Sequence, residues 1–390
     1  MKGIEEAELE GKNVLLRSDL NLTLDEGKPQ KDLRFERYME TVQELQERGA
    51  RTLVLAHQGR PGRDDFLSLG KHAELMREHL DSEVEFVEGF FGGDPETTME
   101  GMEDGDVALN ENVRFLSEEL NSAPPEIHAN DFMVKHFAEV FDIYVNDAFS
   151  AAHRSHASLV GFPPVMESCA GKVMEEELEN CGRARDEVEN PVLVLGGEKP
   201  SDLVSMLDRM VERADKVLLG GVPGELAMHY RGADIEEKRK WIEERSMDSG
   251  AKHLAEMLDE YPEKFEVPTD VKTDSGNHSS GNVPDGEKPW DIGKETEHHY
   301  KKIVEDADSV VMKGPLGAFE RGFDEGSKTV MEGVANCEGH TVLGGGHTSS
   351  LVKLFGFSLD DFSHVSIAGG AFVRYMSGEK LPAVEALKSH

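Results

Sequence analysis

Short apolar runs alternate with segments of helical periodicity along the whole chain. Each run is three to five residues long and rich in Val, Leu and other apolar residues, which is the pattern of strands buried in a parallel sheet. Ten such strands are predicted, at 14–17, 52–56, 84–87, 107–109, 143–145, 192–195, 217–219, 265–267, 309–312 and 341–343. Repeated alternation of strands with amphipathic helices predicts parallel sheets joined by right-handed crossovers.

The alternation falls into two blocks of similar length. It therefore predicts an α/β fold with two doubly wound parallel-sheet (Rossmann-like) lobes. The length of 390 residues agrees, because a single core stops growing at roughly 250–300 residues. The Gly-Phe-Pro-Pro run at 161–164 breaks the pattern, so the first lobe is assigned to 1–165 and the second to 190–371. Residues 166–189 are expected to form a hinge helix between the lobes.

The clearest helix is expected over 201–213, with Ser201 as its N-cap. Its apolar side chains recur at helical spacing and indicate core packing: Leu203, Met206, Leu207, Met210 and Val211. Residues 277–290 are rich in Gly, Ser and Pro, which is typical of a surface loop.

Composition excludes several functional classes. Asp and Glu outnumber Lys and Arg by 78 to 42, and a net charge of −36 argues against nucleic acid and anionic membranes as partners. The acidic excess fits either an ordinary solvated surface or adaptation to a salty cytoplasm. Three cysteines without a CxxC motif indicate neither a disulfide framework nor a zinc site. With no signal-peptide pattern and no long apolar span, a soluble cytoplasmic protein is expected.

Four glycine clusters lie after strands of the second lobe, and each is expected to open a helix. They are Gly196-Gly197, Gly220-Gly221, Gly344-Gly345-Gly346 and Gly369-Gly370. Glycine lets backbone amides approach an anion, and a helix N-terminus adds partial positive charge. Tight turns use glycine anyway, but four clusters in one lobe favour binding of nucleotide phosphates. None of them matches the P-loop or the GxGxxG pattern.

Two charged residues near these glycines suggest finer roles. Lys199 could reach a transferring phosphoryl group, or it could be an ordinary surface lysine. Glu320, in a turn after another strand, could meet ribose hydroxyls.

The first lobe carries cations where its strands end. The stretch 141–164 runs from a buried strand into a polar loop that contains Arg154. Other cations follow other predicted strands: Arg17, Arg34, Arg60 and Arg114. Each could be an isolated ion-pair partner in an acidic protein. Together, at one edge of a parallel sheet, they predict a site for a small, multiply charged anion. One lobe for an anion and one for a nucleotide indicate a kinase that closes to bring two substrates together.

Seven ordered motifs resemble those of the phosphoglycerate kinase family. They are RSDLN at 17–21, AHQGRP at 56–61, ENVRF at 111–115, YVNDAFSAAHRSHAS at 144–158, GGEKPSDL at 196–203, KGPLGAFE at 313–320 and FSHVSIAGGA at 362–371. The resemblance extends from Val14 to Leu387 and is greatest to the archaeal branch. It implies reversible phosphoryl transfer between ATP and 3-phosphoglycerate, giving ADP and 1,3-bisphosphoglycerate, in a monomer with Mg²⁺ bound to the nucleotide. It also implies that the segment 372–390 returns to the first lobe.

The resemblance assigns roles to individual residues. Substrate binding is expected of Asp19, Leu20, Asn21, Arg34, His57, Gln58, Gly59, Arg60, Arg114 and Arg154. Nucleotide binding is expected of Gly197, Lys199, Gly221, Pro315, Gly317, Glu320, Gly345, Gly346, His347 and Thr348. Catalytic roles are expected of Arg34, Lys199, Gly369 and Gly370. No residue is assigned as a direct ligand of the metal.

Three positions depart from the family pattern. Leu203 stands where a second lysine is common, His347 replaces an acid associated with Mg²⁺, and Lys313 replaces an asparagine. We hypothesise that Lys313 restores part of the lost positive charge, and that Mg²⁺ is held mainly by phosphates and water. Two alternative functions are a non-catalytic anion-binding protein and a kinase for another carboxylate such as acetate. Acetate has no phosphate to occupy so many arginines.

Overall fold

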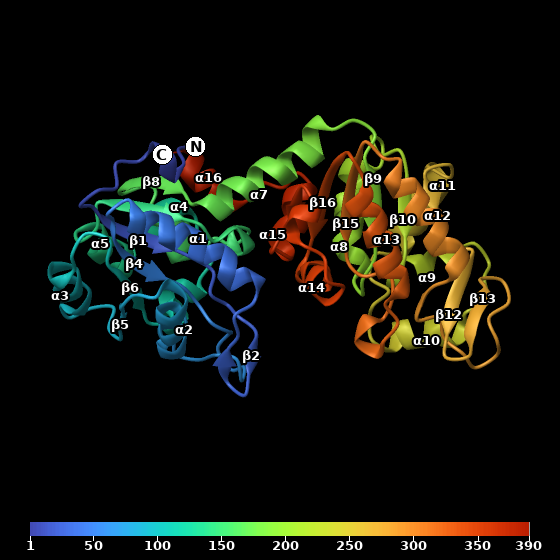
Figure 1. Cartoon of the computed structure of the whole chain (residues 1–390), viewed down its shortest axis with the longest axis horizontal. Helices are drawn as coiled ribbons and strands as arrows, with labels where there is room; N and C mark the ends of the chain where they lie inside the picture. The colour runs from blue at the N-terminus through green and yellow to red at the C-terminus, as the bar shows by residue number, and fades with distance from the viewer. Residues whose placement is uncertain (390) are drawn as a thin grey trace. The chain divides into compact units, whose positions relative to one another are not determined.

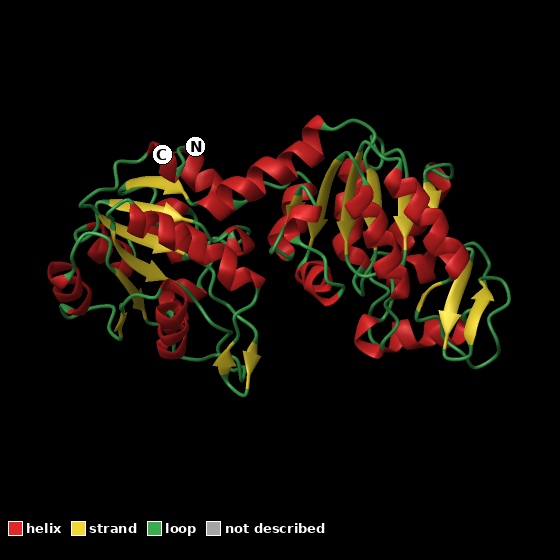
Figure 2. Ribbon diagram, viewed as in Figure 1, coloured by secondary structure: helices red, strands yellow, loops and turns green. Residues whose placement is uncertain are grey.

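The computed structural model describes residues 1–389 and contains two compact units. The first unit comprises Met1–Leu178 together with the C-terminal segment that begins at Lys380. The second unit comprises Glu179–Glu379. In each unit, helices pack on a six-stranded parallel sheet (Figures 1 and 2). No helix among residues 1–389 is both long and apolar enough to span a bilayer.

The sheet of the first unit has the strand order β5-β6-β4-β1-β7-β8. In that order the strands are Val84–Val87, Val107–Asn110, Arg51–Leu55, Asn13–Arg17, Ile143–Asn146 and Glu167–Ala170. The helices are α1 (Leu33–Glu47), α2 (Gly70–Leu80), α3 (Asp94–Gly101), α4 (Pro125–His128), α5 (Phe132–Ala138), α6 (Ala157–Val160) and α16 (Pro382–Ser389). Short 3₁₀ turns occur at Ile4–Glu6, Val113–Phe115, Ser117–Leu120 and Phe149–Ala151, and β2 (Leu24–Asp25) pairs with β3 (Lys28–Pro29) in a hairpin. Helix α16 packs against α6 and β8, so the described part of the C-terminal segment belongs to this unit.

The sheet of the second unit has the strand order β11-β10-β9-β15-β16-β17. In that order the strands are Phe265–Glu266, Val217–Leu219, Val192–Leu195, Ser309–Lys313, His340–Gly344 and His364–Val365. A small antiparallel sheet joins β13 (Gly276–Ser279), β12 (Asp270–Thr273) and β14 (Asp291–Ile292). The helices are α8 (Pro200–Met210), α9 (Gly221–Tyr230), α10 (Glu236–Glu244), α11 (Ala251–Glu260), α12 (Lys294–Glu305), α13 (Glu325–Asn336), α14 (Gly346–Leu354) and α15 (Gly370–Met376). Short 3₁₀ turns occur at Phe319–Arg321 and Leu359–Asp361.

The ten predicted strands are all present, and their ends agree within one residue. The apolar runs form the core because both faces of a parallel sheet are covered by helices, as in β9, where every residue is buried. The prediction of two doubly wound parallel sheets is therefore confirmed.

The sequence predicted one continuous helix over 166–189, but the structure does not have one. The segment contains edge strand β8, then α7 (Lys172–Gly182), then one π-helical segment at Arg183–Glu187. Strand β8 pairs with β7, but its sequence Glu-Ser-Cys-Ala has no apolar run to signal a strand. Residue 390, the end of the predicted tail, lies outside the described residues.

Two local expectations in the second unit were wrong. Helix α8 begins at Pro200 and has Lys199 rather than Ser201 at the N-cap position. Proline suits the first helical position because its φ is already helical and its missing N–H is not needed there. The region 277–290 is not all loop, because part of it forms β13 beside β12. The apolar stripe of α8 is buried as predicted.

Candidate active site

A cationic cavity of about 480 Å³ lies in the first unit. It is lined by Asn21, His57, Gly59, Arg60, Arg63, Asp64, Asp65, Arg114 and Arg154. These residues belong to loops that follow β1, β4, β6 and β7, four strands whose carboxyl ends lie along one edge of the sheet. The structure thus brings together most of the residues that the sequence assigned to substrate binding.

The guanidinium groups in this cavity repel one another. Burial, followed by the charges of Arg154 and Arg17, lowers the pKa of Arg114 to about 10. Burial and the charge of Arg60 likewise lower the pKa of Arg154. Such crowding raises the free energy of the ligand-free cavity and is relieved when an anion binds.

Asp19 and Arg34 lie beside the cavity and hold its wall. Arg34 Nη1 donates to Asp19 Oδ2 at 3.2 Å and to the carbonyl of Asn21 at 3.1 Å. Asp19 also accepts a hydrogen bond from Ser150. Burial alone would raise the pKa of Asp19, but the charge of Arg34 and the hydrogen bond from Ser150 hold it below its usual value. Asp19 is therefore an anionic brace for cationic residues.

His57 lies on a buried charge network. Its Nδ1 is 3.1 Å from Arg17 Nη2, and Arg17 is itself 3.9 Å from the carboxylate of Glu119. Burial first, and then Arg17, keeps the pKa of His57 well below its ordinary value even though Asp19 opposes the shift. A neutral imidazole can donate to or accept from a ligand without adding charge.

Two residues that the sequence assigned to substrate binding lie outside the cavity lining. Leu20 is fully buried in the core. Gln58 is buried and accepts from the amide of Leu22 at 2.9 Å, and its side chain also contacts His72 Nε2 at 3.1 Å. Neither residue lines the cavity. Arg63 does line it, and only its closeness to Arg60 in the Arg-Pro-Gly-Arg sequence could have indicated this.

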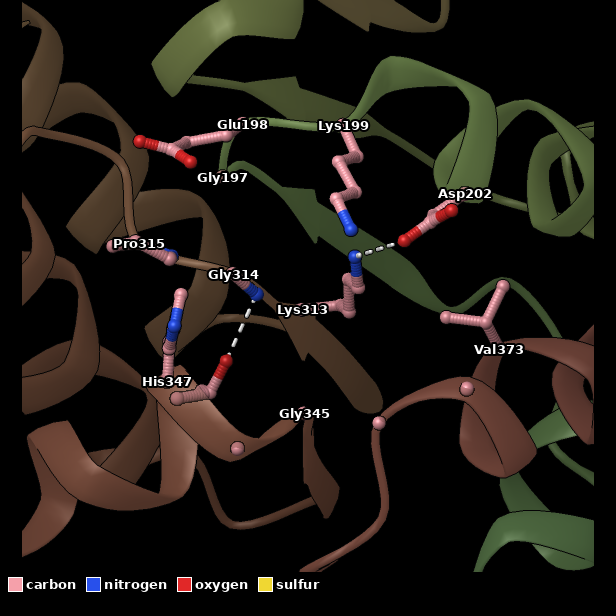
Figure 3. Close-up of a pocket in the computed structure, with 14 residues that line it drawn as sticks. Gly197, Glu198, Lys199, Asp202, Lys313, Gly314, Pro315, Gly345, His347 and Val373 are labelled. Carbon is pink, nitrogen blue, oxygen red and sulfur yellow. Dashed lines mark hydrogen bonds and ion pairs between the residues drawn. The ribbon is translucent and has the colours of Figure 1, made fainter. Parts of the chain in front are cut away.

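A second cavity, of about 330 Å³, lies in the second unit and is lined by glycines from three of the four predicted clusters. Its lining includes Lys199, Asp202, Lys313, Gly345, Gly346, His347, Thr348, Gly369 and Gly370. The side chains of Lys199 and Lys313 point toward one another, and Lys313 Nζ is 3.9 Å from Asp202 Oδ2 (Figure 3). Two ammonium groups next to helix-opening glycines suit an oligophosphate.

The glycine loops interlock so tightly that side chains would not fit. A Cβ on Gly196 would lie 2.2 Å from the carbonyl oxygen of Pro315, and one on Gly314 would lie 2.4 Å from that of Gly196. The amide of Gly197 donates to Pro315 at 2.7 Å. Thr348 Oγ1 accepts from the amide of Gly314 at 2.8 Å (Figure 3). The glycines therefore serve loop packing as well as access to a ligand.

A third cavity, also about 330 Å³, adjoins the second one and shares four of its lining residues: Gly197, Glu198, Pro315 and His347. Three predicted nucleotide-binding residues are found only here, namely Gly221, Gly317 and Glu320. All ten predicted nucleotide-binding residues thus line one of two adjoining cavities.

Comparison with known proteins agrees with this geometry. The phosphoglycerate kinase family profile matches residues 4–379. A phosphoglycerate kinase of Halorubrum lacusprofundi is 42% identical over 393 residues, covering 96% of this chain and 95% of the relative. One of Methanopyrus kandleri is also 42% identical over 393 residues, covering 98% and 96%. The chain belongs to the phosphoglycerate kinase family.

The solved structures support the same assignment. The crystal structure of phosphoglycerate kinase from Pyrococcus horikoshii OT3 matches with a TM-score of 0.93 and 33% identity, covering 100% of this chain and 98% of that one. The family resemblance, with its archaeal relatives, is confirmed. The chain is an enzyme that catalyses reversible phosphoryl transfer between ATP and the carboxylate of 3-phosphoglycerate. The alternatives of a non-catalytic binder and an acetate-type kinase are thereby excluded.

Phosphoglycerate kinases use Mg²⁺ with ATP, so the donor set of the second cavity matters. Two carboxylates line it, Glu198 and Asp202, and Asp202 already faces Lys313. Mg²⁺ prefers oxygen ligands and keeps several waters. The carboxylates present therefore fit a Mg²⁺ ion that is bound together with the nucleotide.

Proposed function

We propose that the cationic cavity of the first unit binds 3-phosphoglycerate and that the two adjoining cavities of the second unit bind Mg–ATP. The observation that carries this assignment is the crowding of Arg60, Arg114 and Arg154 around one cavity in a strongly acidic protein. Mutual repulsion among the three destabilises the ligand-free cavity. A phosphate and a carboxylate on one small molecule would neutralise it.

The proposed roles within the first cavity follow from the donors available. Guanidinium forks bind phosphate through paired N–H groups, which suits Arg60, Arg114 and Arg154. Asn21 and His57 can hydrogen-bond the hydroxyl or carboxylate of the ligand. The amide of Gly59 donates to Asn21 Oδ1 at 2.8 Å, which fixes the asparagine side chain at the wall.

Arg34 is proposed to stabilise the transferring phosphoryl group. Its guanidinium is held by Asp19 and the carbonyl of Asn21, so its position is set before a ligand binds. A fixed cation stabilises the transition state more than a mobile one does, because no reorganisation is needed when charge develops.

The second unit is proposed to bind the nucleotide through its phosphates. Lys199 and Lys313 would neutralise the terminal phosphates, and amides at the start of α14 and near Gly369 and Gly370 would bind their oxygens. Glu320, in the adjoining cavity, would accept from ribose hydroxyls.

The transfer itself needs no covalent enzyme intermediate. A carboxylate oxygen of 3-phosphoglycerate attacks the γ-phosphorus of ATP. The bond to the β,γ-bridging oxygen breaks, and its electrons leave with ADP. The residues contribute orientation and charge neutralisation, which account for most catalysis of phosphoryl transfer. Mg²⁺ bound with the nucleotide would further neutralise the phosphate oxygens, and Glu198 and Asp202 are the carboxylates that would help to hold it.

Several coarser features belong to the same proposal. Residues 166–189, which include α7, are proposed to act as the hinge, because direct transfer requires the two substrates to meet. The enzyme is proposed to work as a cytoplasmic monomer.

Binding measurements with Arg154→Ala test the assignment of the first cavity. Loss of one charge-assisted contact should weaken 3-phosphoglycerate binding about 10- to 100-fold, with the KM for ATP unchanged. Arg239→Ala, which removes an arginine paired with Glu236 and Glu243 on the surface of α10, is the matched control. Unchanged affinity for 3-phosphoglycerate in Arg154→Ala would contradict the assignment.

A further inference from the structure

A buried arginine lies directly behind an imidazole that lines the cationic cavity of the first unit. Arg17 ends β1, and only 1% of its side chain is exposed. His57 follows β4, the strand that pairs with β1 (Figure 1), and lines the cavity. Arg17 Nη2 lies 3.1 Å from His57 Nδ1. Because a buried charge costs free energy, packing alone does not explain an arginine at this position.

The contacts of the Arg17 side chain select one tautomer of His57. Its Nε donates to Ser158 Oγ at 2.8 Å, and its Nη1 donates to the carbonyl of Ser18. A guanidinium has five N–H donors and no acceptor, so in the contact with Nη2 the His57 Nδ1 must accept. A neutral imidazole that accepts at Nδ1 carries its proton on Nε2.

Ser158 and Glu119 hold the guanidinium from the other side. The hydroxyl of Ser158, in α6, donates to Glu119 Oε1 at 2.7 Å, and the amide of Ser158 donates to Glu119 Oε2 at 2.8 Å. Glu119 is fully buried and lies 3.9 Å from Arg17 Nη2. Since the only hydroxyl proton of Ser158 goes to Glu119, its oxygen can only accept from Arg17. Every proton in this network therefore has one direction.

The charges around His57 favour the neutral ring. Burial lowers the pKa of His57, Asp19 raises it, and Arg17, Arg114 and Arg154 lower it, with a net shift well below the ordinary value. These groups come from β1 and from the segments that follow β1, β6 and β7. Asp19 Oδ1 lies 3.9 Å from Nδ1, so within residues 1–389 the polar contacts of the ring are all made by Nδ1. Nε2 is left for a ligand.

We propose that Arg17, oriented by Ser158 and Glu119, is a positioning residue that holds His57 as the tautomer with its proton on Nε2. His57 then donates from Nε2 to a carboxylate or phosphate oxygen of 3-phosphoglycerate. The inference deepens the proposed binding of 3-phosphoglycerate in the first unit and rests on it. A nitrogen that can only donate selects for an acceptor, so an anionic oxygen suits it and an ammonium group does not.

The tautomer can be observed in the ligand-free enzyme by ¹⁵N NMR of the histidine rings. The chain has 16 histidines, and comparison with His57→Gln identifies the signals of His57. From about pH 6 to about pH 8, wild-type His57 should show a protonated Nε2 and an unprotonated Nδ1. Adding 3-phosphoglycerate should shift the Nε2–H signal and leave Nδ1 unprotonated.

Removing Arg17 and Glu119 together tests the positioning role without leaving one buried charge unpaired. In the double variant Arg17→Met, Glu119→Gln, nothing donates to Nδ1, and Asp19 remains beside the ring. His57 should then titrate at a higher pH and, above that pH, divide between its two neutral tautomers. An imidazolium still donates from Nε2, so the variant should bind 3-phosphoglycerate best at low pH. The ratio of its KM for 3-phosphoglycerate to that of the wild type should rise with pH by about 10-fold, and taking the ratio cancels the ionisation of the substrate.

Two replacements of His57 imitate its two tautomers. The amide nitrogen of glutamine can occupy the place of Nε2, whereas that of asparagine can occupy the place of Nδ1. His57→Gln should therefore weaken 3-phosphoglycerate binding about threefold, and His57→Asn about 10- to 100-fold. The matched control for loss of an arginine is Arg48→Met, because Arg48 donates to the carbonyls of Ile4 and Ala7, which precede β1. It should lower the unfolding midpoint but leave the His57 signals and the pH dependence of the KM unchanged.

The outcomes separate this inference from the function on which it rests. A wild-type ring protonated at Nδ1 would overturn the tautomer, and an unchanged tautomer in the double variant would overturn the role of Arg17. An Nε2–H signal that 3-phosphoglycerate does not move would overturn the donation to the ligand. If the double variant does not fold, the wild-type signals and the two His57 variants still decide. If Arg154→Ala binds 3-phosphoglycerate as tightly as the wild type, the proposed substrate site itself is wrong.

Discussion

Lys313 departs from the family pattern at a position where the structure gives it an unusual environment. It ends β15, its side chain is 14% exposed, and it faces Lys199 in the second cavity (Figure 3). Burial, together with the charge of Lys199, lowers the pKa of Lys313, whereas Asp202 opposes the shift. Two ammonium groups held this close in a partly desolvated cavity are unfavourable without a ligand. A terminal phosphate between them would reverse the sign of the interaction.

Replacing Lys313 by methionine should therefore lower turnover more than substrate affinity. Lys313→Met keeps most of the side-chain volume but removes the charge, so kcat should fall about 100-fold if the cation acts on charge in the transition state. The KM for 3-phosphoglycerate should change less than about twofold. Steady-state kinetics with each substrate varied in turn would show this split. Lys302→Met, at an exposed position of α12, is the control. Unchanged kcat in Lys313→Met would reject the role.

Arg34, beside the proposed 3-phosphoglycerate site, is a second cation proposed to act on charge in the transition state. Arg34→Ala should lower kcat about 100- to 1,000-fold with little change in the KM for ATP, because a preorganised cation is lost. Arg34→Lys keeps a charge but loses the two-point contact with Asp19 and the carbonyl of Asn21. Its kcat should therefore lie between that of the wild type and that of Arg34→Ala. A coupled assay of ATP and 3-phosphoglycerate measures both. Equal rates for the alanine and lysine variants would mean that charge is not what Arg34 contributes.

At the level of elements, the site depends on where strands end and how the following loops pack. Each of the four glycine clusters follows a strand and precedes a helix: α8, α9, α14 and α15. Two of these loops lock onto the loop that follows β15 through backbone hydrogen bonds, such as Gly197 to Pro315 and Gly221 to Leu316. The positions of the amides that face a ligand are thus fixed by neighbouring loops of the sheet, as preorganisation requires.

Helix α7 offers a test of electrostatics at an element boundary. Asp147 follows β7 and is fully buried, and its Oδ1 accepts from the amide of Met174 in the first turn of the helix at 3.1 Å. Burial raises the pKa of Asp147 to about 7, although the helix amides, such as that of Met174, act in the opposite direction. An ordinary aspartate has a pKa of 3.8. The folded protein therefore binds a proton between these values that the unfolded chain releases.

The sign of the effect on stability follows directly. As pH rises from about 4 to about 7, this group makes the folded state less stable, and above pH 7 its contribution stays constant. Asp147→Asn keeps the acceptor but does not ionise. Between pH 5 and 8, the free energy of unfolding of the wild type should fall by about 2–3 kcal/mol more than that of Asp147→Asn. Urea unfolding followed by far-UV circular dichroism measures this, with exposed Asp104→Asn as the control. Identical pH slopes for wild type and Asp147→Asn would contradict the shifted pKa.

The sequence could predict elements that are signalled locally, but not those defined only by their neighbours. Strands such as β9 and β10 were located to the residue because an unbroken apolar run has one stable place, inside a covered parallel sheet. Strand β8 and the short β17 were missed because pairing with β7 and β16, rather than composition, makes them strands. Edge strands depend on tertiary contacts in this way.

The same distinction applies to the site. Arginines after strands could be gathered at one sheet edge by the rule for parallel sheets. Arg60, Arg114 and Arg154 line the cavity, whereas Arg34 braces its wall and Arg17 is buried against Ser158. The contact of Trp241 with Trp290 at the third cavity could not be predicted, because the two residues are 49 positions apart and belong to no local motif. Gln58 was predicted to bind substrate, and in the structure its side chain contacts Leu22 and His72, which the sequence could not indicate.

At the scale of the whole molecule, the dominant feature is the mismatch between overall and local charge. The net charge is −36, yet the substrates are anions and the first-unit cavity is lined by four arginines. Acidic residues dominate exposed helices such as α10, where Glu236, Glu237, Glu243 and Glu244 surround a few cations. Such a surface repels anionic substrates at long range and destabilises the folded chain through self-repulsion.

Salt should therefore act in opposite directions on the surface and on the cavity, and the surface should dominate. The screening length falls from about 10 Å at 0.1 M salt to about 3 Å at 1 M, which removes long-range repulsion between charges but acts less on contacts inside a cavity. Between 0.05 and 2 M KCl we expect both the unfolding midpoint and kcat/KM for 3-phosphoglycerate to rise. Thermal scans and coupled assays over this range measure the two quantities.

Sucrose stabilises folded proteins by exclusion without screening charge, so it should raise the midpoint but leave the substrate KM unchanged. Maximal activity in dilute buffer would show that the acidic surface is only a solvated face. Comparing the salt dependence of Arg154→Ala with that of the wild type locates the effect. If long-range repulsion governs substrate capture, both should gain similarly with salt, because the variant loses a contact but keeps the field.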